Sequence, residues 1–162
     1  MILPTHALVG AVIGENINSS WLVAILAVVV HFIMDAFRHG EYLYANSKKN
    51  TFRNSWWKVI LEVSSAVFLI FLLFYFKNPA PEIKKNIFIG ALFSVLPDLV
   101  TFIYWLNNQF SGRTNYFLEK YYFFHSKIHR YPRNAPERVW NFRNARNDII
   151  ISALAIILLL FT

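Results

Sequence analysis

The sequence predicts an all-α membrane protein, a polytopic bundle of about five apolar helices with one more short helix in a polar excursion. The 162-residue chain is 56% hydrophobic and 18% aromatic but only 15% charged, unlike an average soluble domain. Its apolar stretches cover residues 21–33, 59–76, 87–106 and 149–161. A helix crosses the hydrocarbon core of a bilayer with roughly 20 residues, and these stretches reach that length alone or with their flanks.

A chain of this length fits one domain, residues 1–162. The first predicted helix covers residues 4–16 and is short for a full span, with a proline tolerated in its first turn. The polar residues 15–20 end it and cap a second helix over residues 20–38. Gly40 fits the stop of that second helix.

The basic, asparagine-rich residues 42–54 are predicted to form a loop before a third helix at residues 55–76. The Asn-Pro-Ala-Pro sequence at 78–81 predicts a tight break. A fourth helix follows at residues 82–108. We expect it to bend near Pro97, because proline removes one backbone hydrogen bond and clashes with the preceding turn.

Residues 109–147 form a long polar excursion that holds a predicted short helix at residues 115–130, and the last helix covers residues 148–161. The net charge of +7 is concentrated in this excursion and in the segment after the second helix. Lysine and arginine accumulate in cytoplasmic loops of membrane proteins, so both segments and the N-terminus are predicted to lie inside. We therefore expect basic loops near anionic headgroups and no nucleic-acid partner.

Histidine and aspartate recur at spacings of four residues. The second predicted helix contains His31, Asp35 and His39, which would form one stripe because residues four apart share a helix face. His125 and His129 make a second pair with the same spacing. Imidazole nitrogen and carboxylate oxygen are ligands that zinc prefers, so the pattern indicates a metal site.

Two further residues extend this pattern, His6 near the start of the first helix and Asp98 after Pro97 in the fourth. A carboxylate in an apolar span costs roughly 2.5–3.5 kcal/mol and needs a partner. The chain has no cysteine, so a metal has to be held by other ligands. The predicted ligands, all placed at the inner leaflet by the charge bias, are His6, His31, Asp35, Asp98, His125 and His129, with His39 as a ligand or outer-sphere partner.

These motifs resemble a known family. Pro-Thr-His-Ala-Leu-Val-Gly at the start, His-Phe-Ile-Met-Asp-Ala-Phe-Arg-His-Gly-Glu in the second helix, Leu-Pro-Asp in the fourth and a late His-x₃-His are similar to bacterial membrane-bound metal-dependent hydrolases. These are small inner-membrane proteins that include an SOS-inducible member, and zinc-dependent phospholipase C resembles them more distantly. The resemblance implies a hydrolase in the bacterial cytoplasmic membrane. Leu99, Val100 and Thr101 depart from that family's Leu-Pro-Asp-x-Asp-His motif.

The predicted function is metal-dependent hydrolysis of a phosphoester in a membrane lipid or lipid-linked phosphate. One or two Zn²⁺ ions are expected, with Mn²⁺ or another divalent cation as an alternative, and Asp35 or Asp98 would bridge the ions or orient water. A metal or proton transporter is a second interpretation, because ionisable residues inside membranes also mark ion pathways. A third is a structural protein in which a metal only joins helices. The sequence leaves the substrate and the oligomeric state open.

Overall fold

The computed structural model describes residues 1–40, 52–111, 115–132, 135, 137 and 139–161, and within these ranges the fold is all-helical, as predicted. The predicted loop at residues 42–54 lies mostly outside the described part of the chain. The helices are α1 (Leu3–Asn16), α2 (Ser20–Asp35), α3 (Phe52–Lys77), α4 (Pro81–Phe110), α5 (Tyr116–Ile128) and α6 (Phe142–Phe161).

Within the described residues, fewer helices are long and apolar enough to cross a membrane than the five predicted. Three are long and apolar enough, namely α4, α6 and the Trp56–Lys77 part of α3. The apolar α2 has 16 residues and α1 has 14, which correspond to about 24 Å and 21 Å at 1.5 Å per residue. A bilayer core is about 30 Å thick, so these two helices are short for it.

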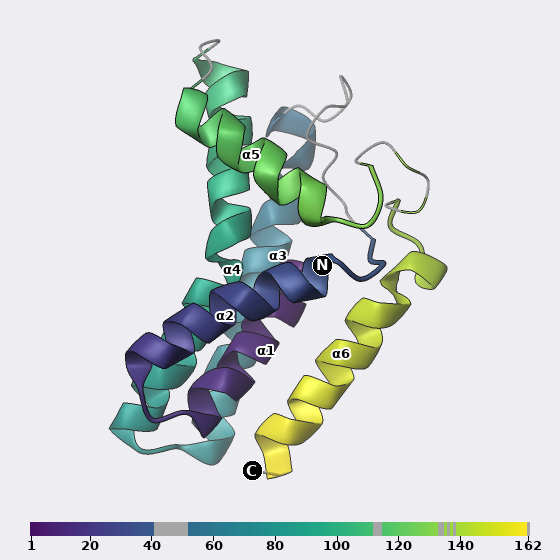
Figure 1. Ribbon diagram of the computed structural model, residues 1–162. Helices are drawn as coiled ribbons and strands as arrows, with labels where there is room; N and C mark the ends of the chain where they lie inside the picture. Colours follow the sequence, from purple (N-terminus) through teal and green to yellow (C-terminus); the bar gives the residue numbers. More distant parts are fainter. Residues whose placement is uncertain (41–51, 112–114, 133–134, 136, 138, 162) are drawn as a thin grey trace.

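Helix α1 is the centre of the bundle and contacts α2, α3, α4 and α6 (Figure 1). Helix α5 lies across the other helices near the C-terminal end of α4 and contacts both α4 and α2. The N-terminus of α1, the C-terminus of α2 and the C-terminal end of α5 therefore meet in one region (Figure 1). This convergence positions the site described below.

The close packing of α1 on α4 depends on glycine. A Cβ atom added at Gly10 would collide with the backbone carbonyl of Gly90, and one added at Gly90 would collide with the carbonyl of Gly10. A Cβ at Gly14 would meet the carbonyl of Asn86 in the same way. The Gly-x₃-Gly spacing in α1 thus lets two backbones approach closely, as small residues do in membrane helix pairs.

Substituting Gly90 with alanine should lower the free energy of unfolding by about 1–3 kcal/mol, because backbone atoms cannot move aside as a flexible side chain would. Thermal unfolding of the purified protein in detergent measures the change. Val29→Ala in α2 is the matched control, since Val29 is 47% exposed and loses little packing. A Gly90→Ala protein as stable as the wild type would contradict the packing of α1 on α4.

The outer faces of the long helices are apolar. Large side chains such as Phe68 and Phe71 on α3 and Leu154 and Ile157 on α6 are exposed. Contiguous exposed apolar surface marks contact with a membrane or a partner protein. Together with the three candidate spans, these faces are consistent with a membrane protein.

Candidate metal centre

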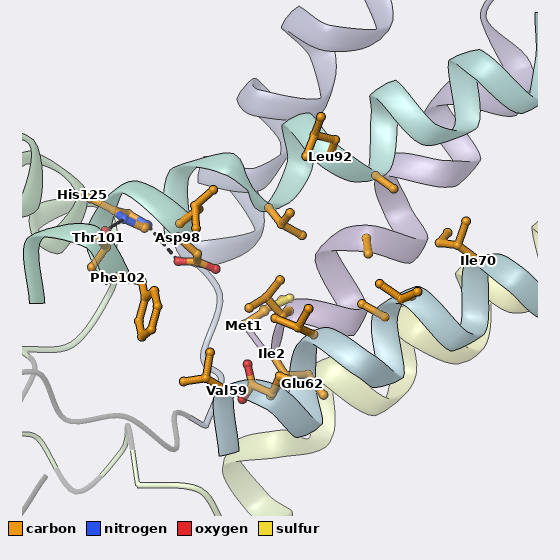
Figure 2. A pocket seen from close by; sticks show the side chains of 18 of the residues that line it. Met1, Ile2, Val59, Glu62, Ile70, Leu92, Asp98, Thr101, Phe102 and His125 are labelled. Carbon is orange, nitrogen blue, oxygen red and sulfur yellow. Dashed lines mark hydrogen bonds and ion pairs between the residues drawn. The ribbon is translucent and has the colours of Figure 1, made fainter. Parts of the chain in front are cut away.

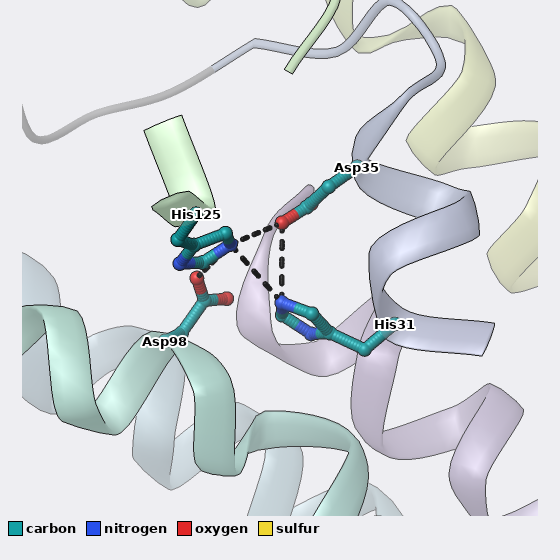
Figure 3. A group of neighbouring side chains, drawn as sticks. All are labelled: His31, Asp35, Asp98 and His125. Atoms are coloured by element: carbon teal, nitrogen blue, oxygen red, sulfur yellow. Dashed lines mark hydrogen bonds and ion pairs between the residues drawn. The ribbon is translucent and has the colours of Figure 1, made fainter. Parts of the chain in front are cut away.

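The carboxylate of Asp35 is the centre of a buried cluster (Figure 3). Asp35 is the last residue of α2 and is completely buried. Its Oδ2 lies 2.7 Å from His125 Nε2 and 3.1 Å from His31 Nε2. Its Oδ1 lies 3.2 Å from His6 Nε2. Three helices thus direct imidazole rings at one carboxylate.

The positions of these side chains follow from their helices. His31 and Asp35 are one turn apart on α2 and share its inward face. His6 is in the first turn of α1, and its ring stacks on that of His31 with 4.2 Å between centroids. His125 is in the last turn of α5 and is 1% exposed. The ring of Phe32 packs edge-on against both His31 and His125.

Asp98 contributes a second carboxylate from α4. Its Oδ1 lies 3.8 Å from His125 Nε2 and its Oδ2 lies 3.9 Å from His6 Nε2. Its side chain is 26% exposed, whereas that of Asp35 is fully buried. The two carboxylates therefore have different environments, one closed off and one accessible.

Hydrogen bonds fix which nitrogen of each ring faces the cluster. His31 Nδ1 lies 2.8 Å from the carbonyl oxygen of Ser94, which can only accept, so Nδ1 carries the proton. The hydroxyl of Thr101 donates to the Pro97 carbonyl at 3.3 Å and so accepts from His125 Nδ1 at 2.8 Å. A neutral imidazole at either position then has its lone pair on Nε2. Outer-sphere partners of this kind orient histidine ligands in metal sites.

His39 is placed differently from the prediction. Helix α2 ends at Asp35, so His39 does not lie on the helical stripe of His31 and Asp35 that the spacing predicted. The chain leaves the helix after Ala36 and still returns His39 to the cluster, where it is buried. Its Nδ1 donates to the Phe37 carbonyl at 2.8 Å, so a metal held by His39 would bind Nε2.

His129 follows the end of α5 as its C-cap residue. Its ring centroid lies 5.1 Å from that of His39 and 5.1 Å from that of His125. Its Nε2 is 3.5 Å from Asp35 Oδ2. His125 and His129 therefore meet His39 at the carboxylate of Asp35.

Among the described residues, two groups of side chains could hold a metal ion. His31, Asp35, Asp98 and His125 offer ligand atoms that all lie within 4.8 Å of one another, and Asp35, His39 and His129 form a second such group. Asp35 belongs to both. His6 belongs to neither group, although its Nε2 is close to both carboxylates.

The residue types of the first group suit a divalent cation, and one of its separations matches that of two ligands on a single ion. Ligand atoms around a tetrahedral ion with bonds of 2.1 Å lie about 3.4 Å apart, and His31 Nε2 and His125 Nε2 are 3.3 Å apart. Lone pairs of neutral imidazoles that face a carboxylate repel it unless a proton or a metal lies between them. The amino group of Met1, 2.7 Å from Asp35 Oδ1, already places one positive charge there.

A cavity of about 480 Å³ adjoins the centre (Figure 2). Its walls are mainly apolar side chains of α1, α3 and α4, and Asp98, Thr101, His125 and His129 also line it. The more accessible carboxylate of the cluster thus faces an apolar space. A hydrocarbon chain could occupy this space while a polar group reaches the cluster.

Tyr121 borders the centre from α5. Its hydroxyl donates to the Pro97 carbonyl at 3.1 Å. Burial, with the nearby carboxylates of Asp98 and Asp35, raises the pKa of Tyr121 above its usual range. The phenol therefore stays neutral and holds α5 against the carbonyl at the turn before Asp98.

Sequence reasoning missed two acidic residues. Glu62 lies within the apolar run of α3 and lines the cavity. The signal that could have identified it is an ionisable residue inside an apolar helix. Asp148 on α6 is 1% exposed and accepts a hydrogen bond from the backbone amide of Ile2 at 2.9 Å. Asp148 thereby holds the residue that precedes α1, and no local sequence pattern indicates that contact.

No family model, no curated protein and no solved structure matches this chain. The resemblance to membrane-bound metal-dependent hydrolases therefore stays a prediction. The function of the chain is therefore inferred from the geometry of the described residues.

Proposed function

We propose that this chain is a metal-dependent hydrolase of the bacterial cytoplasmic membrane that cleaves a phosphoester of a lipid or lipid-linked phosphate. One observation carries the proposal: histidine Nε2 atoms from separate elements converge on Asp35 beside an apolar cavity. The predicted resemblance to membrane-bound metal-dependent hydrolases agrees with it. Basic segments flanking the site favour the cytoplasmic leaflet, whose anionic lipids attract them.

The two ligand groups suit two divalent cations that share Asp35. His31, His125 and Asp98 would complete the first position, and His39 and His129 the second. Such ions, zinc being the best match to these ligands, lower the pKa of water to about 7 and stabilise charge on phosphoryl oxygens. Shared carboxylate ligation explains why one aspartate is buried among so many imidazoles.

Asp98 is the proposed proton acceptor. Its side chain is partly exposed and lines the cavity, so it reaches both the cluster and a bound substrate. In hydrolysis the oxygen of water bonds to phosphorus while the bond from phosphorus to the lipid oxygen breaks. One water proton passes to Asp98 and returns to the leaving oxygen, which balances the reaction.

Zinc loading followed by elemental analysis and a phosphate-release assay tests the proposal. We expect about two zinc ions per chain, the number that two ligand groups with a shared carboxylate accommodate. Phosphate or phosphoalcohol should be released from phospholipid or polyprenyl phosphate micelles. Protein that binds no transition metal after loading would overturn the proposal. Bound zinc without turnover on any such lipid would instead support a metal that only joins helices.

A further inference from the structure

Glu62 is a carboxylate near the N-terminal end of a candidate membrane span. It lies in the Trp56–Lys77 segment of α3, whose most apolar 18-residue stretch has a mean hydropathy of 2.4. Ionisable residues are costly in such segments and mark sites for ligands, ions or protons. Glu62 belongs to neither ligand group of the metal centre. Its position therefore needs a separate explanation.

The Glu62 carboxylate is directed into the cavity. Val59 and Ala66 are three and four residues from it on α3, on the same helix face, and line the cavity with it. Figure 2 shows Glu62 and Asp98 reaching into this space from α3 and α4. Glu62 also interacts electrostatically with Asp98. The two carboxylates thus share one apolar space.

Among the described residues, this space has no lysine or arginine to match its two acids. The amino group of Met1 is buried against Asp35 at 2.7 Å, and its charge also acts on Glu62. A ligand that carries its own positive charge would complement this end of the cavity.

The cavity also reaches the apolar surface of the helices. Val67 on α3 and Phe88 and Leu92 on α4 line it, and each side chain is largely exposed. In a membrane those residues contact hydrocarbon. A lipid chain can therefore enter between α3 and α4, whereas a small soluble cation would leave the apolar walls unfilled.

We infer that the cavity binds a phospholipid whose headgroup carries an ammonium group, and that Glu62 pairs with that ammonium. The acyl chains lie along α3 and α4, and the phosphate faces Asp98 and the histidines. The placement of the phosphate rests on the proposed function. The pairing of Glu62 with an ammonium does not, because it requires only binding.

Competition between two lipids with identical acyl chains tests the inference. Phosphatidylethanolamine and phosphatidylglycerol are offered together to the zinc-treated protein in detergent, and native mass spectrometry gives the ratio bound. We expect the ethanolamine lipid to be preferred about tenfold, as a charge-assisted hydrogen bond allows. The Glu62→Gln variant should reduce the preference to within about twofold, because it removes the charge and keeps the shape.

Glu82→Gln on α4 is the matched control, since the Glu82 side chain is 82% exposed. It should leave the preference unchanged. Equal binding of the two lipids by the wild type, or an unchanged preference in Glu62→Gln, would overturn the inference. The wild-type comparison decides the question even where the variant fails to fold. The lipid preference can be measured without turnover and without bound zinc. A failure of the hydrolase proposal would therefore leave this result unaffected.

Discussion

Replacing Asp35 with asparagine is expected to abolish zinc binding at both positions. Asp35 is the one residue shared by the two ligand groups, and its oxygens contact His6, His31, His125 and His129. The amide keeps the size of the side chain but loses the charge that the cation requires. Phosphoester hydrolysis should fall at least about a thousandfold, since it depends on the metal. Elemental analysis after zinc loading and the lipid-phosphate assay measure the two effects.

The His39→Ala variant gives the informative comparison. His39 belongs only to the group with Asp35 and His129, so its loss should remove one zinc and leave the other. Glu82→Gln serves again as the control, because the Glu82 side chain is exposed and pairs with Lys85, so its charge plays no part in the ligand groups. Full zinc content in Asp35→Asn would show that Asp35 does not bridge two ions.

Removal of metal with a chelator should lower the unfolding temperature of the wild type by about 10 °C. A ligand present at a thousand times its dissociation constant stabilises the folded state by about 4 kcal/mol, and each kcal/mol corresponds to about 2–4 °C for a chain of this size. The ligands come from α2, α4 and α5 and from the segments that follow α2 and α5. A cation therefore joins elements that are distant in the sequence.

Thermal unfolding with and without chelator, followed by zinc replacement, measures this stabilisation. The Asp35→Asn protein should not respond to the chelator, because it holds no metal to remove. Recovery of the wild-type unfolding temperature on adding zinc, but not magnesium, would agree with nitrogen ligation. If the chelator does not change the unfolding temperature of the wild type, no metal joins α2, α4 and α5 in the way proposed.

The amino-acid sequence determined the helical class and most of the site. Apolar stretches of about helix length predicted α2, α3, α4 and α6. This works because apolar side chains favour both the protein core and the hydrocarbon of a membrane. The four-residue spacing of His31 and Asp35 placed them on one helix face, as observed. The run around Glu62 contained a readable signal as well, since a carboxylate in an apolar span is costly.

Only the tertiary structure decided where α2 ends and what its last residues contact. The spacing placed His39 on the helix, but the helix ends at Asp35 and the chain turns His39 toward His129. Helix length also limited α1 and α2 to less than a full span. Asp148 reaches Ile2 from the other end of the chain. Local periodicity describes one helix at a time, whereas these contacts join segments far apart in sequence, and only packing of the whole bundle brings them together.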